Sequence, residues 1–233
     1  RETGCRGPFM KRILVIAAHS DDEVLGCGGS IAAQVDRGGE VSVVFLTNGV
    51  GARNADSNSA IERRMEASRN AGKILGVKEI TQQNFPDNRL DSVPLLDIVQ
   101  SIEPVIADLC PSVILTHHAH DLNVDHRVCH QAVLTACRPQ PKHPVKTILG
   151  FEVASSTEWA FSAPAFVPNY YVDISSQLDK KLRALDAYRE EMRSAPHPRS
   201  ASSVEALARW RGATVGCGAA EAFSVVRMIS TGI

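Results

Sequence analysis

The sequence lacks long apolar runs and any concentration of positive charge. No apolar stretch approaches the roughly 20 residues that a membrane-spanning helix needs. The 25 Lys and Arg residues are dispersed among 26 Asp and Glu residues, and the formal net charge is −1. These absences argue against a membrane protein and against a nucleic-acid partner. We expect a cytoplasmic enzyme that acts on a small molecule.

The sequence also lacks a Cys-Xaa-Xaa-Cys pair, the spacing typical of redox motifs and structural zinc sites. Most of its six cysteines lie among apolar or small residues, as buried free thiols do. A chain of 233 residues can bury a sufficient core without disulfides. We therefore expect a reduced protein.

No internal repeat, low-complexity tract or long linker divides the chain. Its 233 residues fit one domain. Met10 is followed by Lys-Arg and a strand-like run, so residues 1–9 are interpreted as an expression scar. We predict a single domain over residues 10–233, in which about 150–233 form a more irregular C-terminal lobe.

Strand-like and helix-like segments alternate along the chain. This alternation is typical of parallel βαβ units. We predict an α/β fold: a Rossmann-like open, mostly parallel sheet with helices on both faces and a C-terminal cap lobe. The predicted strands are 13–17, 41–46, 79–83, 113–115, 146–149, 170–174 and 223–229. The predicted helices are 24–37, 61–75, 95–109, 125–137, 178–192 and 204–211.

One imidazole and three carboxylates follow the first predicted strand, in the run His19-Ser20-Asp21-Asp22-Glu23. Like charges at this density repel one another, and a bound cation would reverse the repulsion. The run is therefore interpreted as half of a metal site. An acidic N-cap before a helix is the alternative interpretation.

A second polar loop, 116–127, follows the central predicted strand and contains four histidines together with Asp121, Asn123 and Asp125. In open α/β sheets, ligands bind beyond the carboxyl ends of the strands, at the point where the strand order reverses. We expect the two loops to meet there. His117 and His118 stay ambiguous between the site and ordinary strand-end positions, and His130 is interpreted as a polar helix residue.

With both motifs in view, the chain resembles the PIG-L/LmbE family of zinc-dependent N-deacetylases. The resemblance rests on His-Xaa-Asp-Asp-Glu after the first strand and Asp-Leu-Asn-Xaa-Asp-His about a hundred residues later. It covers nearly the whole chain from Lys11. Weaker matches lie at 47–49 with Arg53, and at 85–90, 168–173, 197–200 and 220–223.

The resemblance implies a zinc site with three protein ligands, His19, Asp22 and His126, and implies that Asp21 is the general base. Three N and O ligands leave zinc an open position, as in catalytic sites. The same donors also suit Fe²⁺, Co²⁺ or Mn²⁺. Glu23 is expected to support or cap the helix.

The chain departs from the family at Asn123, where many members have histidine. Asparagine donates a hydrogen bond but delivers no proton. We expect Asn123 to be structural or to donate to an oxyanion, and the leaving amine to be protonated by Asp21, His120 or His197. Asp125 is expected to orient an imidazole, with a helix cap as the alternative.

Substrate contacts are expected from loops at the same sheet edge. Arg53, Asp87 and Asn88 would bind sugar hydroxyls, and Arg53 could instead pair with a phosphate or carboxylate. His120 and His197 are further candidates to bind substrate. Arg199 and Glu221 could close the pocket from the C-terminal lobe, with solvated loop charges as the alternative for this whole group.

The resemblance implies a hydrolase that removes acetyl from an N-acetylated amino sugar, a GlcNAc-type conjugate. Two alternatives stay open. The first is the same chemistry on another N-acyl intermediate, such as an antibiotic or thiol-cofactor precursor. The second is a non-catalytic sugar-binding module. A homo-oligomer is also left open by the sequence.

Overall fold

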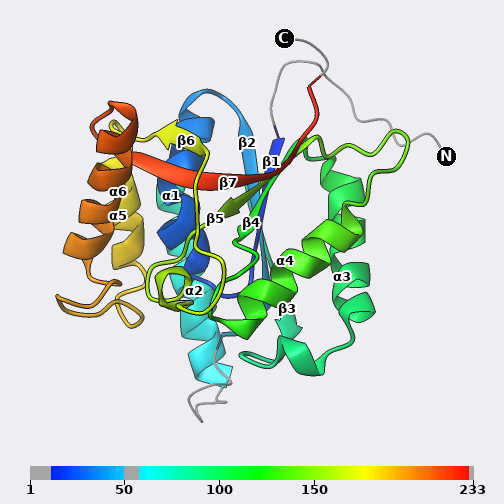
Figure 1. Cartoon of the computed structure of the whole chain (residues 1–233). Helices are drawn as coiled ribbons and strands as arrows, with labels where there is room; N and C mark the ends of the chain where they lie inside the picture. Colours follow the sequence, from blue (N-terminus) through cyan, green and yellow to red (C-terminus); the bar gives the residue numbers. More distant parts are fainter. Residues whose placement is uncertain (1–11, 50–57, 231–233) are drawn as a thin grey trace.

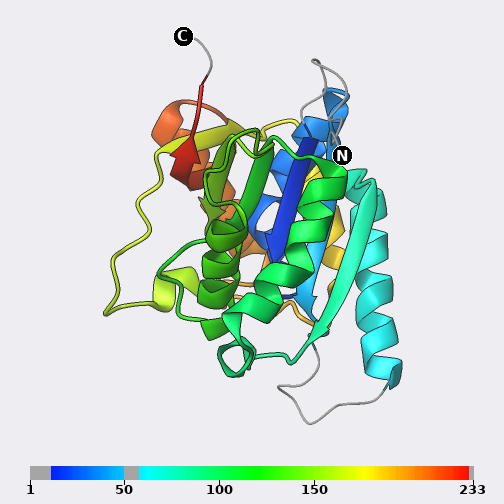
Figure 2. The ribbon, with the colours of Figure 1, turned by 90° about the vertical axis from the view of Figure 1, so that its right-hand side faces the viewer.

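The computed structural model describes residues 12–49 and 58–230, whose strands form one seven-stranded sheet in the order β3-β2-β1-β4-β5-β7-β6 (Figures 1 and 2). The strands from β1 to β5 are parallel, and β7 runs antiparallel to both β5 and β6. The predicted Rossmann-like fold is confirmed. The strands are β1 (Arg12–Ala17), β2 (Glu40–Thr47), β3 (Glu79–Phe85), β4 (Val113–His117), β5 (Thr147–Phe151), β6 (Tyr170–Asp173) and β7 (Ala220–Met228).

Helices cover both faces of the sheet, because successive strand residues point to opposite sides. Val15 packs into the core on the side of α1, whereas Leu14 and Ile16 pack toward α3 and α4. One face carries α1 (Asp22–Asp36), α2 (Asn58–Leu75), α5 (Leu178–Asp186) and α6 (Ala201–Val215), and the other carries α3 (Leu95–Leu109) and α4 (Val124–Ala136) (Figure 1). Among the helices of the described residues, none has the length and hydrophobicity that a membrane span requires.

The C-terminal segment is continuous with the main sheet rather than a separate layer. Strand β7 forms backbone hydrogen bonds with β5, and α5 and α6 pack on the same side as α1 (Figure 1). Helix α5 ends at Asp186, six residues before the predicted end, and the chain turns through residues 187–191. This turn places the Tyr188 hydroxyl 2.6 Å from Glu23 Oε1 at the start of α1.

Close packing explains the glycines of α1. A Cβ on Gly26 would lie 2.3 Å from the Phe151 ring, and one on Gly29 would lie 2.6 Å from Ile174. The helix is kinked at Cys27, and the Glu221 carboxylate accepts the freed N–H groups of Gly29 (2.9 Å) and Ser30. Glu221 therefore caps the second half of α1.

The described cysteines differ in oxidation state. Four are free thiols, Cys27, Cys129, Cys137 and Cys217. Cys110 is disulfide-bonded, so the expectation of a reduced protein is wrong at this residue.

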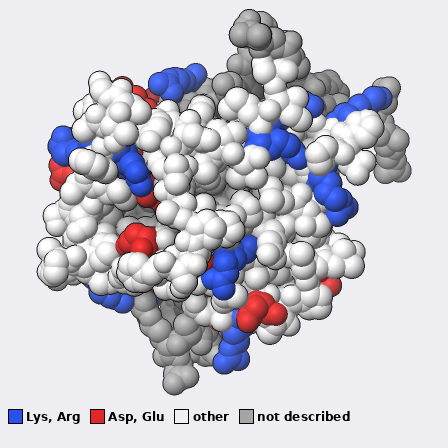
Figure 3. All heavy atoms as spheres, viewed as in Figure 1, with Lys and Arg blue, Asp and Glu red and all other residues white. Residues whose placement is uncertain are grey.

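Residues of opposite charge are interspersed on the face seen in Figure 3, which agrees with the dispersed charges of the sequence.

Candidate metal and active site

The two polar loops meet where the strand order reverses. Strand β1 lies between β2 and β4, so the loop after β1 and the loop after β4 emerge side by side at the same sheet edge. Helix α1 begins at Asp22 and helix α4 at Val124. Each loop therefore ends in a buried helical turn that holds its side chains in place.

His19, Asp22 and His126 form a compact triangle of donor atoms. His19 Nδ1 lies 3.1 Å from Asp22 Oδ2, and His126 Nε2 lies 3.3 Å from each of these atoms. Zinc with N and O bonds of 2.0–2.1 Å in a tetrahedron separates its ligand atoms by about 3.3–3.4 Å. The triangle therefore fits a tetrahedral metal ion. All three side chains are buried, and Asp22 Oδ1 has no hydrogen-bond partner among the described residues.

Asp125 contacts the imidazole of His19. Its Oδ2 lies 3.1 Å from His19 Nε2, the nitrogen on the side of the ring away from the triangle. The same carboxylate accepts the backbone N–H groups of Asn88 (2.7 Å) and Leu90 (2.9 Å). Asp87 also approaches His19 Nε2, at 3.3 Å. The group of His19, Asp87 and Asp125 is thus explained by hydrogen bonds that hold the imidazole, without a second ion.

Asp121 orients His126, a contact that the sequence analysis missed. Asp121 Oδ1 lies 3.1 Å from His126 Nδ1, and the carboxylate also accepts hydrogen bonds from the hydroxyls of Ser156 and Thr157. Burial alone would raise the pKa of Asp121, but His126 and the two hydroxyls hold this pKa below its ordinary value. The sequence did contain a signal for this contact, because Asp121 is an acidic residue in the same polar loop as His126.

Asp21 lies beside the triangle with one carboxylate oxygen free. Its Oδ2 accepts a hydrogen bond from Arg199 Nη1 at 2.7 Å, whereas its buried Oδ1 has no partner among the described residues. Burial raises the pKa of Asp21, and Arg199 partly offsets that rise. A carboxyl whose pKa is raised toward neutrality is better suited to accept a proton. The backbone φ of Asp21 is 122°, a conformation that costs a non-glycine residue on the order of 1–3 kcal/mol.

Asn123 is the N-cap of α4. Its Oδ1 accepts the backbone N–H of Asp125 at 2.8 Å, and its Nδ2 lies 3.3 Å from Asn88 Oδ1. Both ends of the side chain are therefore in use. This placement favours the structural role over the oxyanion role, the two that the sequence left open.

His117 packs against His126, one member of the donor triangle. It is fully buried, its Nε2 accepts the backbone N–H of Ala18 at 2.8 Å, and its ring stacks on His126 with 3.9 Å between the ring centroids. His130 Nδ1 lies 2.8 Å from the carbonyl oxygen of His117. His117 Nε2 also lies 3.5 Å from Asp22 Oδ2, but neither histidine is part of the compact donor triangle.

The predicted substrate-binding residues lie at different depths. Asp87 is buried beside His19. Asn88 donates its backbone N–H to Asp125 and accepts a hydrogen bond from Asn123, so it contacts the start of α4. Exposed His120 lines a cavity of about 310 Å³ together with Trp159. His197 packs edge-on against Trp159, with 5.8 Å between the centroids. Arg53 lies outside the described residues.

The chain is similar in sequence to known proteins. The family model for PIG-L, GlcNAc-PI de-N-acetylase, matches residues 14–137, which contain both motifs. The uncharacterized deacetylase YaiS of Escherichia coli (strain K12) is 34% identical over 185 residues, covering 77% of this chain and 91% of YaiS. The match to YaiS thus spans nearly all of that protein.

Solved structures show the same fold. The N,N'-diacetylchitobiose deacetylase of Pyrococcus horikoshii aligns with a TM-score of 0.76 at 21% identity, covering 94% of this chain and 85% of that one. GalB, the 4-carboxy-2-hydroxymuconate hydratase of Pseudomonas putida KT2440, aligns with a TM-score of 0.75 at 23% identity, covering 96% and 99%. A deacetylase and a hydratase share this fold, so the fold alone does not decide the reaction.

Family membership therefore rests on sequence as well as fold. The matched region is more than half of the chain, and it carries the two motifs whose side chains the structure brings together. The relative YaiS independently matches over three quarters of the chain. The chain belongs to the PIG-L family of de-N-acetylases.

Proposed function

We propose that this protein is a zinc-dependent hydrolase that removes the acetyl group from an N-acetylated amino sugar of the GlcNAc type. The observation that carries the proposal is the buried donor triangle next to a carboxylate with one free oxygen. A non-catalytic sugar-binding module has no need of a proton acceptor beside a metal site. The geometry therefore favours a hydrolase over such a module.

His19, Asp22 and His126 would hold the metal, with Asp125 and Asp121 holding the two imidazoles. Bound zinc would supply Lewis-acid chemistry, by polarising an amide carbonyl and making water more acidic. Fe²⁺, Co²⁺ and Mn²⁺ are the alternatives that the donor atoms also accept.

Asp21 would act as the general base through its free Oδ1. Arg199 holds Oδ2, so the carboxylate presents one oxygen in a fixed orientation. The same oxygen would then return the proton to the leaving amine, since Asn123 caps a helix and carries no transferable proton. His120 and His197, which both lie near Trp159, are the alternative proton donors.

The sugar class is supported by the family and by one structural relative. The matching family model is that of a GlcNAc-PI de-N-acetylase, and the Pyrococcus enzyme is a deacetylase of diacetylchitobiose. In our proposal Asp87 and Asn88 bind sugar hydroxyls beside the donor triangle, together with Arg53, which lies outside the described residues. Another N-acyl intermediate, such as an antibiotic or thiol-cofactor precursor, is the alternative substrate class.

The test combines metal analysis with an acetate-release screen over free, nucleotide-linked and glycosidic GlcNAc. We expect about one zinc ion per chain, held by His19, Asp22 and His126, and acetate release from at least one sugar. Asp21→Asn should keep the zinc and lose turnover. Acetate release at the wild-type rate by this variant would overturn the role of Asp21, and release only from non-sugar amides would favour the alternative substrate class.

A further inference from the structure

The peptide bond between Ser20 and Asp21 is held at both of its polar ends. Its carbonyl oxygen accepts a hydrogen bond from Arg64 Nη2 of α2 at 3.2 Å. Its N–H, which belongs to Asp21, donates to Glu23 Oε2 at 3.0 Å. We propose that Glu23 and Arg64 are positioning residues that clamp this peptide and so aim the carboxylate of Asp21, an inference that rests on the general-base role proposed above.

This peptide controls where the base points. The φ angle of Asp21 is the rotation between that peptide plane and the Cα that carries the side chain. Its value of 122° is one that L-residues rarely adopt, so an unrestrained Asp21 would relax to negative φ. The two hydrogen bonds of the clamp oppose this relaxation directly, because they fix both ends of the rotating plane.

The unusual φ angle separates two neighbouring carboxylates. Asp22 turns its Oδ2 to His19 and His126, whereas Asp21 turns its Oδ2 to Arg199. Asp21 also occupies the N-cap of α1 without using its side chain as a cap. The helix thus forgoes the usual stabilising contact of an N-cap aspartate, which leaves that carboxylate available for chemistry.

Two residues of the C-terminal segment hold Glu23 and Arg64 in place. The Tyr188 hydroxyl donates to Glu23 Oε1 at 2.6 Å, and Arg64 Nη1 donates to Glu191 Oε1 at 2.5 Å. Arg64 Nε further donates to Ser20 Oγ at 3.2 Å. Glu23 is 2% exposed and Tyr188 is 2% exposed, so water does not compete for their hydrogen bond.

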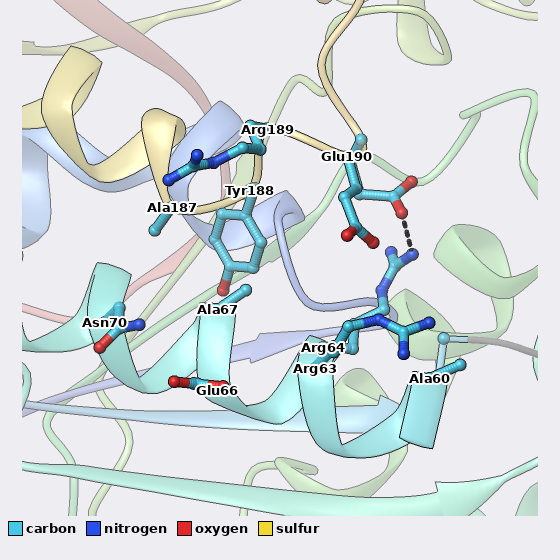
Figure 4. Close-up of a pocket in the computed structure, with 12 residues that line it drawn as sticks. Ala60, Arg63, Arg64, Glu66, Ala67, Asn70, Ala187, Tyr188, Arg189 and Glu190 are labelled. Atoms are coloured by element: carbon cyan, nitrogen blue, oxygen red, sulfur yellow. Dashed lines mark hydrogen bonds and ion pairs between the residues drawn. The ribbon is translucent and has the colours of Figure 1, made fainter. Parts of the chain in front are cut away.

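The supporting residues line one cavity. Figure 4 shows Arg64 and Tyr188 on the wall of a cavity of about 420 Å³ between α2 and the turn that follows α5. Arg63, the chain neighbour of Arg64, lines the same cavity. Its guanidinium forms no hydrogen bond with Ser20 in the part of the chain that the structure describes, so Arg63 offers a matched control.

The test measures deacetylation, zinc content and hydrogen exchange in Glu23→Ala, Arg64→Ala, Tyr188→Phe and the control Arg63→Ala. We expect Glu23→Ala and Arg64→Ala to lower kcat on the order of 10- to 100-fold with KM and zinc content little changed. Tyr188→Phe should give a smaller loss in the same direction. Amide exchange in the peptide spanning residues 19–25 should become faster in Glu23→Ala, whereas Arg63→Ala should match the wild type.

Glu23→Gln provides the rescue. The glutamine oxygen can still accept the Asp21 N–H, so this variant should recover most of the kcat that Glu23→Ala loses. Wild-type kcat in Glu23→Ala and Arg64→Ala, together with unchanged amide exchange, would overturn the clamp. Loss of zinc in step with loss of kcat would also overturn it, because the residues would then act on the metal site.

The clamp and the proposed function fail in different ways. If Asp21→Asn is inactive while the clamp variants keep wild-type kcat, the base assignment stands and the clamp is wrong. If Asp21→Asn keeps its activity, the base assignment is wrong. The exchange measurement needs no turnover, so it tests the hold on the Asp21 amide even where no sugar is deacetylated.

Discussion

The replacement Asp121→Asn should weaken zinc binding while leaving the fold intact. Asp121 accepts a hydrogen bond from Nδ1 of His126, whose Nε2 belongs to the donor triangle. Asparagine has almost the same volume, so no cavity forms, but the negative charge that holds the imidazole is lost. Removing such a carboxylate typically lowers metal affinity 10- to 100-fold, or about 1.4–2.7 kcal/mol.

The assay is a competition titration of zinc between the protein and a chromogenic chelator. Asp125→Asn should show a loss of the same order, because Asp125 holds His19 in the equivalent way. Asp173→Asn is the matched control, since Asp173 is an exposed aspartate at the end of β6 that accepts hydrogen bonds from Ser175 in the turn that follows. Its zinc affinity should equal that of the wild type.

Two results would refute this reasoning. Zinc affinity of Asp121→Asn equal to that of the control would show that the carboxylate does not support the ligand histidine. A circular-dichroism spectrum that differs from the wild type in the metal-free state would show that the change acts on folding. Retained secondary structure together with weakened zinc binding is the expected combination.

Further predictions concern the metal, the cap and the packing of α1. Chelation of the metal should abolish acetate release, and added zinc should restore it; activity that persists without metal would contradict the proposed function. Asn123→Ala should lower the free energy of unfolding by about 1 kcal/mol, because α4 loses its N-cap hydrogen bond. It should change kcat only a few-fold, whereas the loss of an oxyanion donor would lower kcat roughly 10²–10³-fold. Gly26→Ala would place a Cβ 2.3 Å from Phe151, so denaturant unfolding should show a loss of about 1–3 kcal/mol; an unchanged midpoint would contradict the close packing.

The order of strands and helices could be predicted from the sequence because it depends on local patterns. Apolar runs of strand length and helical periodicities reflect burial within each segment, and both are visible over a few residues. The predicted helix 95–109 agrees with α3 at both ends, and the α1 and α4 boundaries agree within two residues. Helix α2 begins three residues before its prediction, and α6 extends three and four residues beyond its predicted ends. The largest difference is at α5, whose sequence pattern continues past Asp186 where the chain turns.

The meeting of the two motifs could also be predicted, since parallel strands deliver their carboxyl ends to one edge. The choice of His19, Asp22 and His126 as candidate ligands came from the family resemblance, and the structure brings their donor atoms within 3.3 Å of one another. Which carboxylate holds which imidazole could not be predicted. Asp121 and Asp125 lie in the same loop, and only the turn into α4 decides that Asp121 contacts His126 and Asp125 contacts His19.

Two charged residues of the C-terminal segment have partners that lie far away in the sequence. The sequence treated Arg199 and Glu221 alike, as residues that could close the pocket. The fold brings Arg199 to Asp21 across 178 positions of the chain, and takes Glu221 to the backbone of Gly29 across 192 positions. The order of strands and helices and the density of polar residues in the two loops could be predicted from the sequence, because these features depend on neighbouring residues. The tertiary structure decided which distant charge supports the candidate base and which one caps a helix, because such contacts depend on how the sheet and its helices pack.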